Sequence, residues 1–326
     1  MQALVLDENT QLSLRQDHPE PHLRPGEALI QPTLTGVCST DIQLANGYMH
    51  FQGVLGHEFV GTVTQTADTK DNHLIGKRVV GEINAVCGAC DLCLKGLREH
   101  CRQRTVLGIL NRDGVFADRF TLPVANLHEV PNHVDDDQAV FTEPLAAAFQ
   151  LVRQLTFEGR PYVTVLGDGR LGLLCAQVLA QLNATVRIVG KHPDKLAVAE
   201  KWGIKHRLLE DVGLRQDQDI VVDATGSPSG ITTALGMVRP RGTIALKTTT
   251  APAPNQQAHP DLARIVVDEI TLVGSRCGPF ATALDALARS AIDVTPLISK
   301  RMKLAAGPDI LTAAKQPNTL KVLVQP

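Results

Sequence analysis

Four cysteines packed into one short stretch are the sharpest chemical signal in the sequence. They follow the spacing Cys87-x2-Cys90-x2-Cys93-x7-Cys101. In a reducing compartment, clustered thiolates are typical of a metal site rather than of disulfides. Four of them close a tetrahedral zinc shell with no open position, so the pattern predicts a structural zinc ion that takes no part in chemistry. The alternative is four incidental surface cysteines.

A second set of residues combines a thiolate, an imidazole and carboxylates. Cys38 precedes the pair His57 and Glu58, and a further carboxylate, Glu143, follows much later in the chain. A catalytic zinc takes about three protein ligands and leaves one position for water or substrate. Taken one at a time, each residue has an ordinary structural alternative: a buried cysteine, a histidine in the core, or a glutamate at the start of a helix. Their occurrence together predicts a catalytic zinc site.

A glycine pattern predicts a dinucleotide site. Gly167, Gly169 and Gly172 have the spacing G-x-G-x-x-G and stand between an expected strand, Tyr162–Leu166, and an expected helix, Leu171–Leu182. In this context the glycines let the backbone approach a pyrophosphate at the helix N-terminus. Arg170 and Leu171 lie inside the same turn and are included in the predicted cofactor site. The alternative is a glycine-rich turn without a ligand.

The choice between NAD and NADP is made at the end of the next strand, Thr185–Val189. Enzymes that use NAD usually place Asp or Glu there, where it accepts a hydrogen bond from the ribose 2′-hydroxyl. This chain instead has Gly190, Lys191 and His192. Gly190 leaves room and Lys191, with His192 nearby, can face a 2′-phosphate, so the sequence favours NADP. Alternatively, these residues form a solvated turn and NAD binds without the acid.

Three regions of the sequence differ in their pattern of apolar residues, glycines and prolines. Residues 1–145 contain short β-like runs separated by Pro and Gly turns, which predicts an irregular, mostly β catalytic domain. Residues 146–275 alternate aliphatic strands, Gly turns and helices, which predicts a doubly wound parallel sheet. Residues 276–326 are too few to fold alone and should complete the first domain. A loop rich in Thr, Pro, Ala and Gln is expected over Thr248–Pro260.

The overall composition fits a two-domain α/β protein and excludes other classes. The chain has 326 residues, of which 44% are hydrophobic, 20% charged and only 3% aromatic. Aliphatic cores suit parallel sheets, and the shortage of aromatic residues disfavours a nucleic-acid platform. The formal charge of −2 recruits no polyanion. Neither a membrane-length apolar run nor a signal peptide is evident, so a cytoplasmic enzyme is expected.

These motifs together resemble the zinc-dependent medium-chain dehydrogenases, the family of alcohol, sorbitol and threonine dehydrogenases. The resemblance covers essentially the whole chain. It rests on Gly36-Val37-Cys38-Ser39-Thr40-Asp41, Gly56-His57-Glu58, the four-cysteine loop, Glu143-Pro144-Leu145-Ala146 and Val165-Leu166-Gly167-Asp168-Gly169. It implies a GroES-like, mostly β catalytic domain joined to a Rossmann domain. Glu143 stands where the alcohol dehydrogenases have a second Cys, so this chain looks closer to the polyol dehydrogenases.

The resemblance also implies roles for individual residues. Cys38 and His57 would bind the catalytic zinc, with either Glu58 or Glu143 as the carboxylate ligand. Thr40 matches the hydroxyl that takes the proton from the substrate alcohol and passes it towards the cofactor ribose, and Thr225 and Ser275 match walls of the nicotinamide site. Many members have a His five residues after the Cys ligand, where this chain has Gln43. The proton must therefore leave by another route, through water or through His50.

The expected function is hydride transfer between NAD(P) and a small alcohol, polyol or carbonyl compound, and a homodimer or homotetramer is expected from the resemblance. Two rivals share the fold. A zinc-free quinone or enone reductase would lack Cys38, His57 and Glu143, and a non-catalytic dinucleotide sensor would have no use for zinc ligands beside Thr40. A zinc-ribbon nucleic-acid module conflicts with the charge and with the dinucleotide turn.

Overall fold

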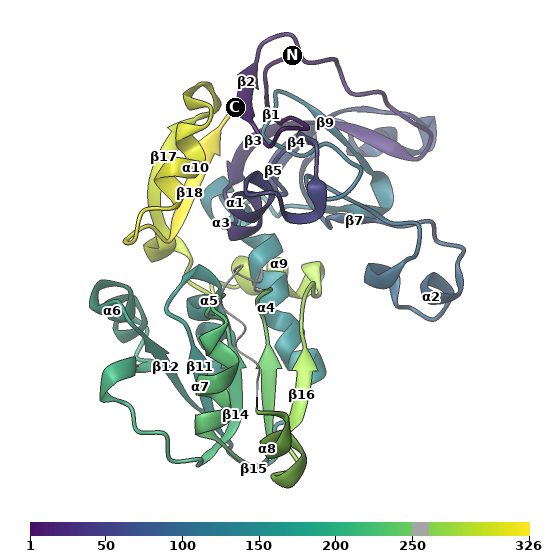
Figure 1. Cartoon of the computed structure of the whole chain (residues 1–326). Coiled ribbons are helices and arrows are strands. Elements are labelled where there is room, and N and C mark those ends of the chain that lie inside the picture. Colours follow the sequence, from purple (N-terminus) through teal and green to yellow (C-terminus); the bar gives the residue numbers. More distant parts are fainter. Residues whose placement is uncertain (250–260) are drawn as a thin grey trace. The chain divides into compact units, whose positions relative to one another are not determined.

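The computed structural model describes residues 1–249 and 261–326. They form two compact units (Figure 1): Met1–Glu143 with Phe280–Pro326, and Pro144–Pro279. The loop expected over Thr248–Pro260 lies outside the described residues except for Thr248 and Thr249. Among the described residues, no helix is both long and apolar enough to cross a membrane.

The first unit is built mainly from short strands. Its strands are β1 (Ala3–Leu6), β2 (Leu12–Arg15), β3 (Glu27–Gly36), β4 (Gly53–Val54), β5 (Glu58–Thr66), β6 (Arg78–Gly81), β7 (Asn84–Ala85), β8 (Thr105–Val106), β9 (Phe120–Pro123), β10 (Leu127–Glu129), β17 (Ile298–Lys303) and β18 (Lys321–Gln325). Its helices are α1 (Ser39–Ala45), α2 (Asp91–Leu94), α3 (Asp136–Ala139), α9 (Phe280–Ala288) and α10 (Asp309–Ala314), and α4 (Thr142–Gln154) begins at its boundary.

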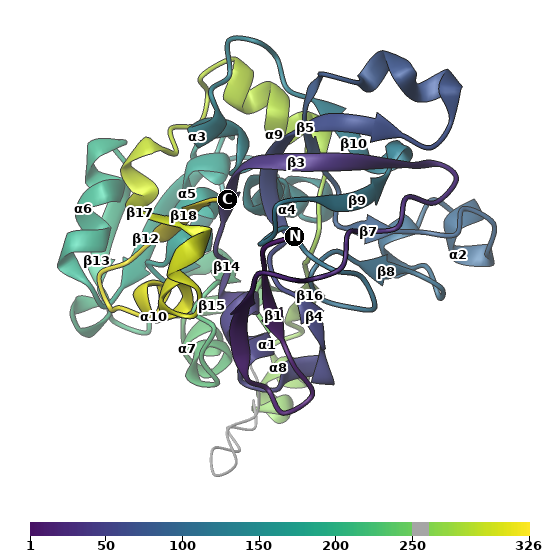
Figure 2. The same cartoon turned by 90° about the horizontal axis from the view of Figure 1, so that it is seen from above.

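One sheet of the first unit brings distant parts of the sequence together. Its strand order is β10-β6-β5-β3-β18-β17, and β9 pairs with the other end of β3 (Figure 2). Strand β3 pairs antiparallel with both β5 and β18, so Gly36 lies opposite Glu58 on one side and Leu323 on the other. The C-terminal segment thus completes the first unit, and the residues at this end of the sheet lie next to the start of α1.

The second unit is a parallel, doubly wound sheet. Its strands are β11 (Tyr162–Leu166), β12 (Thr185–Gly190), β13 (Lys205–Leu208), β14 (Gln218–Asp223), β15 (Val238–Leu246) and β16 (Thr271–Gly274). Its helices are α5 (Arg170–Ala180), α6 (Pro193–Lys201), α7 (Ser229–Met237) and α8 (Leu262–Val267), together with most of α4. The strand order β13-β12-β11-β14-β15-β16 is the 3-2-1-4-5-6 order of dinucleotide-binding sheets.

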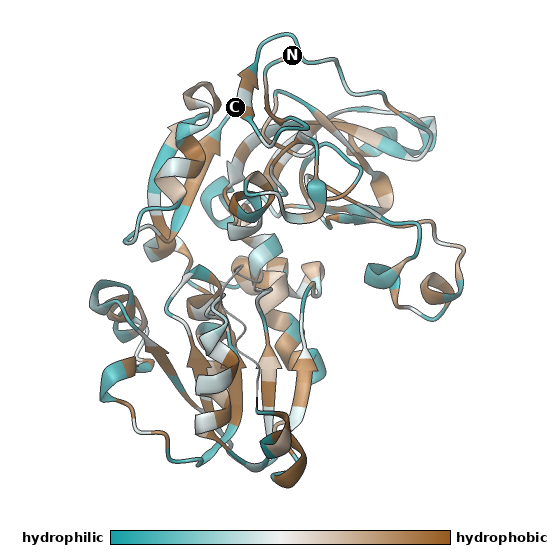
Figure 3. Ribbon diagram, in the orientation of Figure 1, coloured by the Kyte–Doolittle hydropathy of each residue, from teal (hydrophilic) through white to brown (hydrophobic). Residues whose placement is uncertain are grey.

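The sequence explains why this sheet is buried on both faces. The central strands are mainly aliphatic, drawn largely in brown in Figure 3, and Val163, Val165, Ile188 and Val221 are fully buried. Parallel strands covered by helices on both faces have this pattern. The fold class predicted from the sequence, a mostly β domain with a Rossmann sheet, is confirmed.

Candidate functional site

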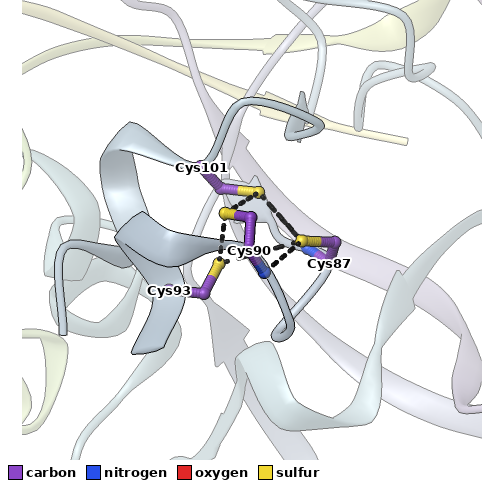
Figure 4. Close-up of side chains that lie close together, drawn as sticks. All are labelled: Cys87, Cys90, Cys93 and Cys101. Atoms are coloured by element: carbon purple, nitrogen blue, oxygen red, sulfur yellow. Dashed lines mark hydrogen bonds between the residues drawn. The ribbon is translucent and has the colours of Figure 1, made fainter. Parts of the chain in front are cut away.

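The four clustered cysteines come together around one point. Figure 4 shows their sulfur atoms facing one another, and the Sγ–Sγ distances are 3.5 Å for Cys87–Cys101, 3.5 Å for Cys90–Cys93, 3.8 Å for Cys90–Cys101 and 4.0 Å for Cys87–Cys93. A tetrahedral ion with Zn–S bonds of about 2.3 Å separates its sulfurs by about 3.8 Å. The four side chains therefore have the geometry of a closed zinc shell, and none of them is in a disulfide.

Backbone amides support the thiolate form of this cluster. The N–H of Cys90 points at the Cys87 sulfur at 3.4 Å, and the N–H of Cys87 points at the Cys101 sulfur at 3.5 Å. Amides of Cys93 and Arg102 lower the pKa of Cys90 to about 6, whereas burial and the sulfur atoms of Cys90 and Cys101 raise the pKa of Cys93 to about 12. A zinc ligand must be deprotonated, so these amides prepare the loop to bind the ion.

Cys38, His57 and Glu58 form the second group of possible metal ligands. One ligand atom from each lies within 4.8 Å of the others. His57 and Glu58 are buried, with 3% and 0% of their surface exposed, while Cys38 is half-buried. Cys38 directly precedes α1, and Glu58 is the first residue of β5, so the antiparallel pairing of β3 and β5 brings the three together.

Asp41, which sequence reasoning left without a role, positions two of these residues. Its Oδ2 accepts the backbone N–H of Cys38 at 2.8 Å, and its Oδ1 lies 3.2 Å from His57 Nδ1. The second contact is a charge contact outside ideal hydrogen-bond angles. Burial favours a lower pKa for His57, but the charges of Asp41 and Cys38 prevail and raise this pKa well above its ordinary value. Nδ1 faces Asp41, which leaves Nε2 as the nitrogen for a metal ion.

Lys321 is a second residue whose role was not predicted. Its Nζ forms an ion pair with Glu58 Oε2, and neither side chain is exposed to solvent. Gly36 leaves room for this pair, because a Cβ at that position would contact both charged groups. The ammonium also lies 5.4 Å from the centre of the Phe141 ring. Burial lowers the pKa of Lys321 to about 7, and the charges of Cys38 and Asp41 oppose that shift.

This group of residues fits a catalytic zinc ion. Glu58 Oε1 is buried and has no hydrogen-bond partner among the described residues, as expected for an atom that needs a cation. A thiolate, an imidazole and a carboxylate are the ligand types that zinc takes in catalytic sites. Three protein ligands leave a fourth position for a substrate oxygen.

The remaining predicted residues of this site lie as follows. The Cys38 thiol points at Thr40 Oγ1 at 3.6 Å, so the hydroxyl lies beside a metal ligand. Glu143 is half-buried in the first turn of α4 and is not part of the group around Cys38. Gln43 is half-buried in α1, and His50 is exposed in the short 3-10 helix Tyr48–His50 that follows.

The glycine turn of the second unit has the geometry that close approach of a ligand requires. Gly167 has φ +108°, and a Cβ there would lie 2.7 Å from the carbonyl oxygen of Ala224. A Cβ at Gly172 would overlap the carbonyl of Gly167. Gly169, the N-cap of α5, has open space where its Cβ would be. Two glycines are thus needed by the fold, whereas the third leaves a cradle at a helix N-terminus that suits a pyrophosphate.

The other predicted cofactor residues lie at the carboxyl ends of neighbouring strands. Lys191 is exposed and His192 half-buried, directly after Gly190 at the end of β12. Thr225 follows β14, and both its N–H and its hydroxyl donate to Asp223. Ser275 follows β16, and its hydroxyl accepts from the buried Lys247 Nζ at 3.1 Å. Cofactors bind outside this edge of a doubly wound sheet.

Comparison with known proteins agrees with both units. The alcohol dehydrogenase GroES-like domain model matches residues 24–132, and the zinc-binding dehydrogenase model matches residues 171–290. The chain is 33% identical to an L-threonine 3-dehydrogenase of Streptomyces avermitilis and 28% identical to a sorbitol dehydrogenase of Halalkalibacterium halodurans. These alignments cover 92% of both chains in the first case and 95% in the second.

Solved structures share the same architecture. A protein described as a zinc-binding dehydrogenase of Sinorhizobium meliloti, bound to NADP, superposes with a TM-score of 0.88 at 27% identity, over 100% of this chain and 99% of the other. An alcohol dehydrogenase of Thermus sp. ATN1 superposes with a TM-score of 0.86 at 25% identity, with the same coverage.

The fold and the gathered ligands define a zinc-binding oxidoreductase that takes a nicotinamide dinucleotide. The chain belongs to the family of zinc-dependent medium-chain dehydrogenases, as its motifs predicted. It transfers hydride between NAD(P) and a small alcohol or carbonyl compound.

Proposed function

We propose that Cys38, His57 and Glu58 hold a catalytic zinc at which a secondary alcohol or polyol reacts. The observation that carries this proposal is the approach of three different ligand types to within 4.8 Å, two of them buried. When bound, the zinc lowers the pKa of an alcohol and the nicotinamide takes up the hydride. The chain's own residues bind, orient and move protons around these groups.

The residues beside the ligands have separate tasks in this proposal. The Thr40 hydroxyl lies 3.6 Å from the Cys38 sulfur, where it can accept the proton of a substrate alcohol while it releases its own proton towards water, so that it acts as a relay. Asp41 fixes the His57 ring, and Lys321 balances the charge of Glu58. Glu58 is the proposed carboxylate ligand in preference to Glu143, because only Glu58 belongs to the gathered group.

The four-cysteine loop is proposed to hold a second, structural zinc. Its sulfur spacing supports a closed tetrahedral shell without a position for substrate. The loop contains only short helical segments, α2 (Asp91–Leu94) and the 3-10 helix Arg98–His100, so an ion would supply much of its stability. Thiolates kept for metal binding also support a reducing location, the cytoplasm.

The cofactor is proposed to be NADP in preference to NAD. Gly190 provides space at the end of β12, and the exposed Lys191 offers a cation to a 2′-phosphate, with the half-buried His192 beside it. Binding of NADPH and NADH to the zinc-loaded protein, followed by nicotinamide fluorescence, measures this preference directly. Tighter binding of NADPH that is lost in Lys191→Ala supports the proposal, whereas equal loss of both cofactors contradicts it.

The chain is further proposed to form a homodimer or homotetramer. Strand β16 is an edge strand of the parallel sheet, and beside it α8, brown in Figure 3, exposes Leu262, Val266 and Val267 at 66%, 76% and 79%. An open edge strand next to exposed aliphatic side chains favours pairing with a second copy of the chain. Light scattering of the wild type and of Val267→Asp measures the oligomeric state. A wild-type oligomer that is weakened in Val267→Asp supports the proposal, and a monomeric wild type contradicts it.

Turnover with defined substrates tests the catalytic site. The zinc-loaded protein is assayed with a panel of secondary alcohols, polyols and amino alcohols, chosen because relatives act on threonine and sorbitol. Cys38→Ser should lose at least about 100-fold in turnover, while Cys277→Ser, a half-buried cysteine outside both clusters, serves as the matched control. Full activity in Cys38→Ser would refute the proposed site.

A further inference from the structure

The end of strand β12 has no acidic residue of its own, but the carboxylate of a residue from a neighbouring turn, Asp168, lies against it. Gly190 closes the strand, and the next acid in the sequence, Asp194, is exposed in the first turn of α6. A Cβ added at Gly190 would overlap the carboxylate of Asp168. Asp168 comes from the glycine turn after β11 and is only 6% exposed. Its side chain therefore occupies the space in which a strand-end side chain would begin.

The Asp168 carboxylate is held firmly in this place. Its Oδ2 accepts the backbone N–H of Lys191 at 2.7 Å and that of His192 at 2.6 Å. The imidazole Nδ1 of His192 lies 3.0 Å from Oδ1 and 3.1 Å from Oδ2. The carboxylate thus binds at the start of α6 (Pro193–Lys201), where backbone amides and the helix dipole favour an anion.

This arrangement has a consequence for a 2′-phosphate. The two amides that would best bind such a group already donate to Asp168. A phosphate at the same strand end would also lie near a fixed negative charge, which repels it. A ribose hydroxyl has the opposite preference, because a carboxylate is a good acceptor for its proton.

We propose that Asp168 sets the selectivity between NAD and NADP, by supplying from the glycine turn the acid that the strand end lacks. The inference rests on the proposed dinucleotide site and refines it. Lys191 and His192 attract the 2′-phosphate through their side chains, while Asp168 favours the 2′-hydroxyl. The two effects oppose each other, so the site accepts both cofactors and Asp168 limits its preference for NADP.

Binding constants of NADH and NADPH for the zinc-loaded full-length protein test this. The measured quantity is the ratio of Kd for NADPH to Kd for NADH. In Asp168→Asn, which keeps an acceptor oxygen but loses the charge, this ratio should fall at least about tenfold. Asp194→Asn removes an exposed acid from the same helix start and should change the ratio less than about twofold.

Moving the acid provides the stronger test. The double variant Asp168→Gly with Gly190→Asp returns the carboxylate to the strand end, and Gly190 is not in the left-handed region, so a side chain is tolerated once Asp168 is gone. The ratio should fall in Asp168→Gly alone and return to within about threefold of wild type in the double variant. A merely structural role for Asp168 would change both Kd values together.

Two outcomes would overturn the inference. If the ratio stays constant in Asp168→Asn and Asp168→Gly, or if the double variant stays as low as Asp168→Gly, Asp168 does not set selectivity. If the wild type binds neither cofactor, the proposed dinucleotide site itself is wrong. These two failures are distinguished by the wild-type titration, which is measured first.

Discussion

Replacing Asp41 by Asn should impair zinc binding at the Cys38 site, although the exchange only converts one carboxylate into an amide of similar shape. The Asp41 carboxylate can only accept, so His57 Nδ1 facing it at 3.2 Å carries the proton and Nε2 is left to bind the metal. In the Asp41→Asn variant, the amide oxygen would keep the N–H of Cys38, and the amide NH₂ would face His57 Nδ1. The proton would then move to Nε2, the atom that the zinc needs.

The magnitude follows from these contacts. Loss of a residue that orients a metal ligand costs about 10- to 100-fold in affinity. Because the exchange also favours the wrong tautomer, the upper end is expected, about 100-fold or about 2.8 kcal/mol. Competition with a chromophoric zinc chelator measures the affinity of each site, since the four-cysteine site serves as an internal reference.

A matched variant controls for the loss of an acid at a helix start. Asp135 caps α3 through its contact with the N–H of Gln138 at 2.8 Å, and Asp135→Asn makes the same chemical change away from the ligands. This variant should keep wild-type zinc affinity at both sites. An affinity within about threefold of wild type in Asp41→Asn would refute the reasoning about the His57 ring.

Three further predictions concern stability, metal content and thiol chemistry. In the metal-free protein, Lys321→Met should cost about 3–5 kcal/mol in urea unfolding, because it leaves Glu58 as a buried unpaired charge. Adding Glu58→Gln should recover most of the loss, and a cost under about 1 kcal/mol would argue against the pair. Cys101→Ser should bind one zinc fewer by elemental analysis while the Cys38 site keeps its ion, and loss of both ions would show that the sites are not separate. Burial raises the pKa of Cys175 to about 12, so this thiol stays neutral and resists alkylation at pH 8 until the protein unfolds; rapid labelling of Cys175 in the folded protein would contradict its environment.

The second unit was predictable because its signals are local. Tyr162–Leu166 was predicted with the bounds that β11 has, since an aliphatic run followed by a glycine turn contains its own limits. In the first unit, strand β3 continues past Pro32 to Gly36, although proline usually interrupts a strand. The register with β5 shifts between Pro32 and Leu34, and this irregularity accommodates a residue that has no N–H to donate.

The ligands of the candidate site were recognisable from the sequence, but their supporting residues were not. Cys38, His57 and Glu58 lie in short motifs, whereas Lys321 is 284 residues from Val37, whose carbonyl it approaches. Nothing local distinguishes an inward-facing Lys in a closing strand from an exposed one. Asp168 was likewise recognised only as part of a glycine motif, because its partners on Lys191 and His192 depend on how β11 and β12 pair.

Zinc content per chain, measured by elemental analysis in the wild type and in Cys38→Ser, is the most direct test of the catalytic metal site. We predict two zinc ions in the wild type and one in Cys38→Ser, with NADPH binding retained in both because the dinucleotide residues belong to the other unit. One zinc ion in both proteins would contradict the account. Cys38, His57 and Glu58 would then be structural residues of a dehydrogenase fold without a catalytic metal.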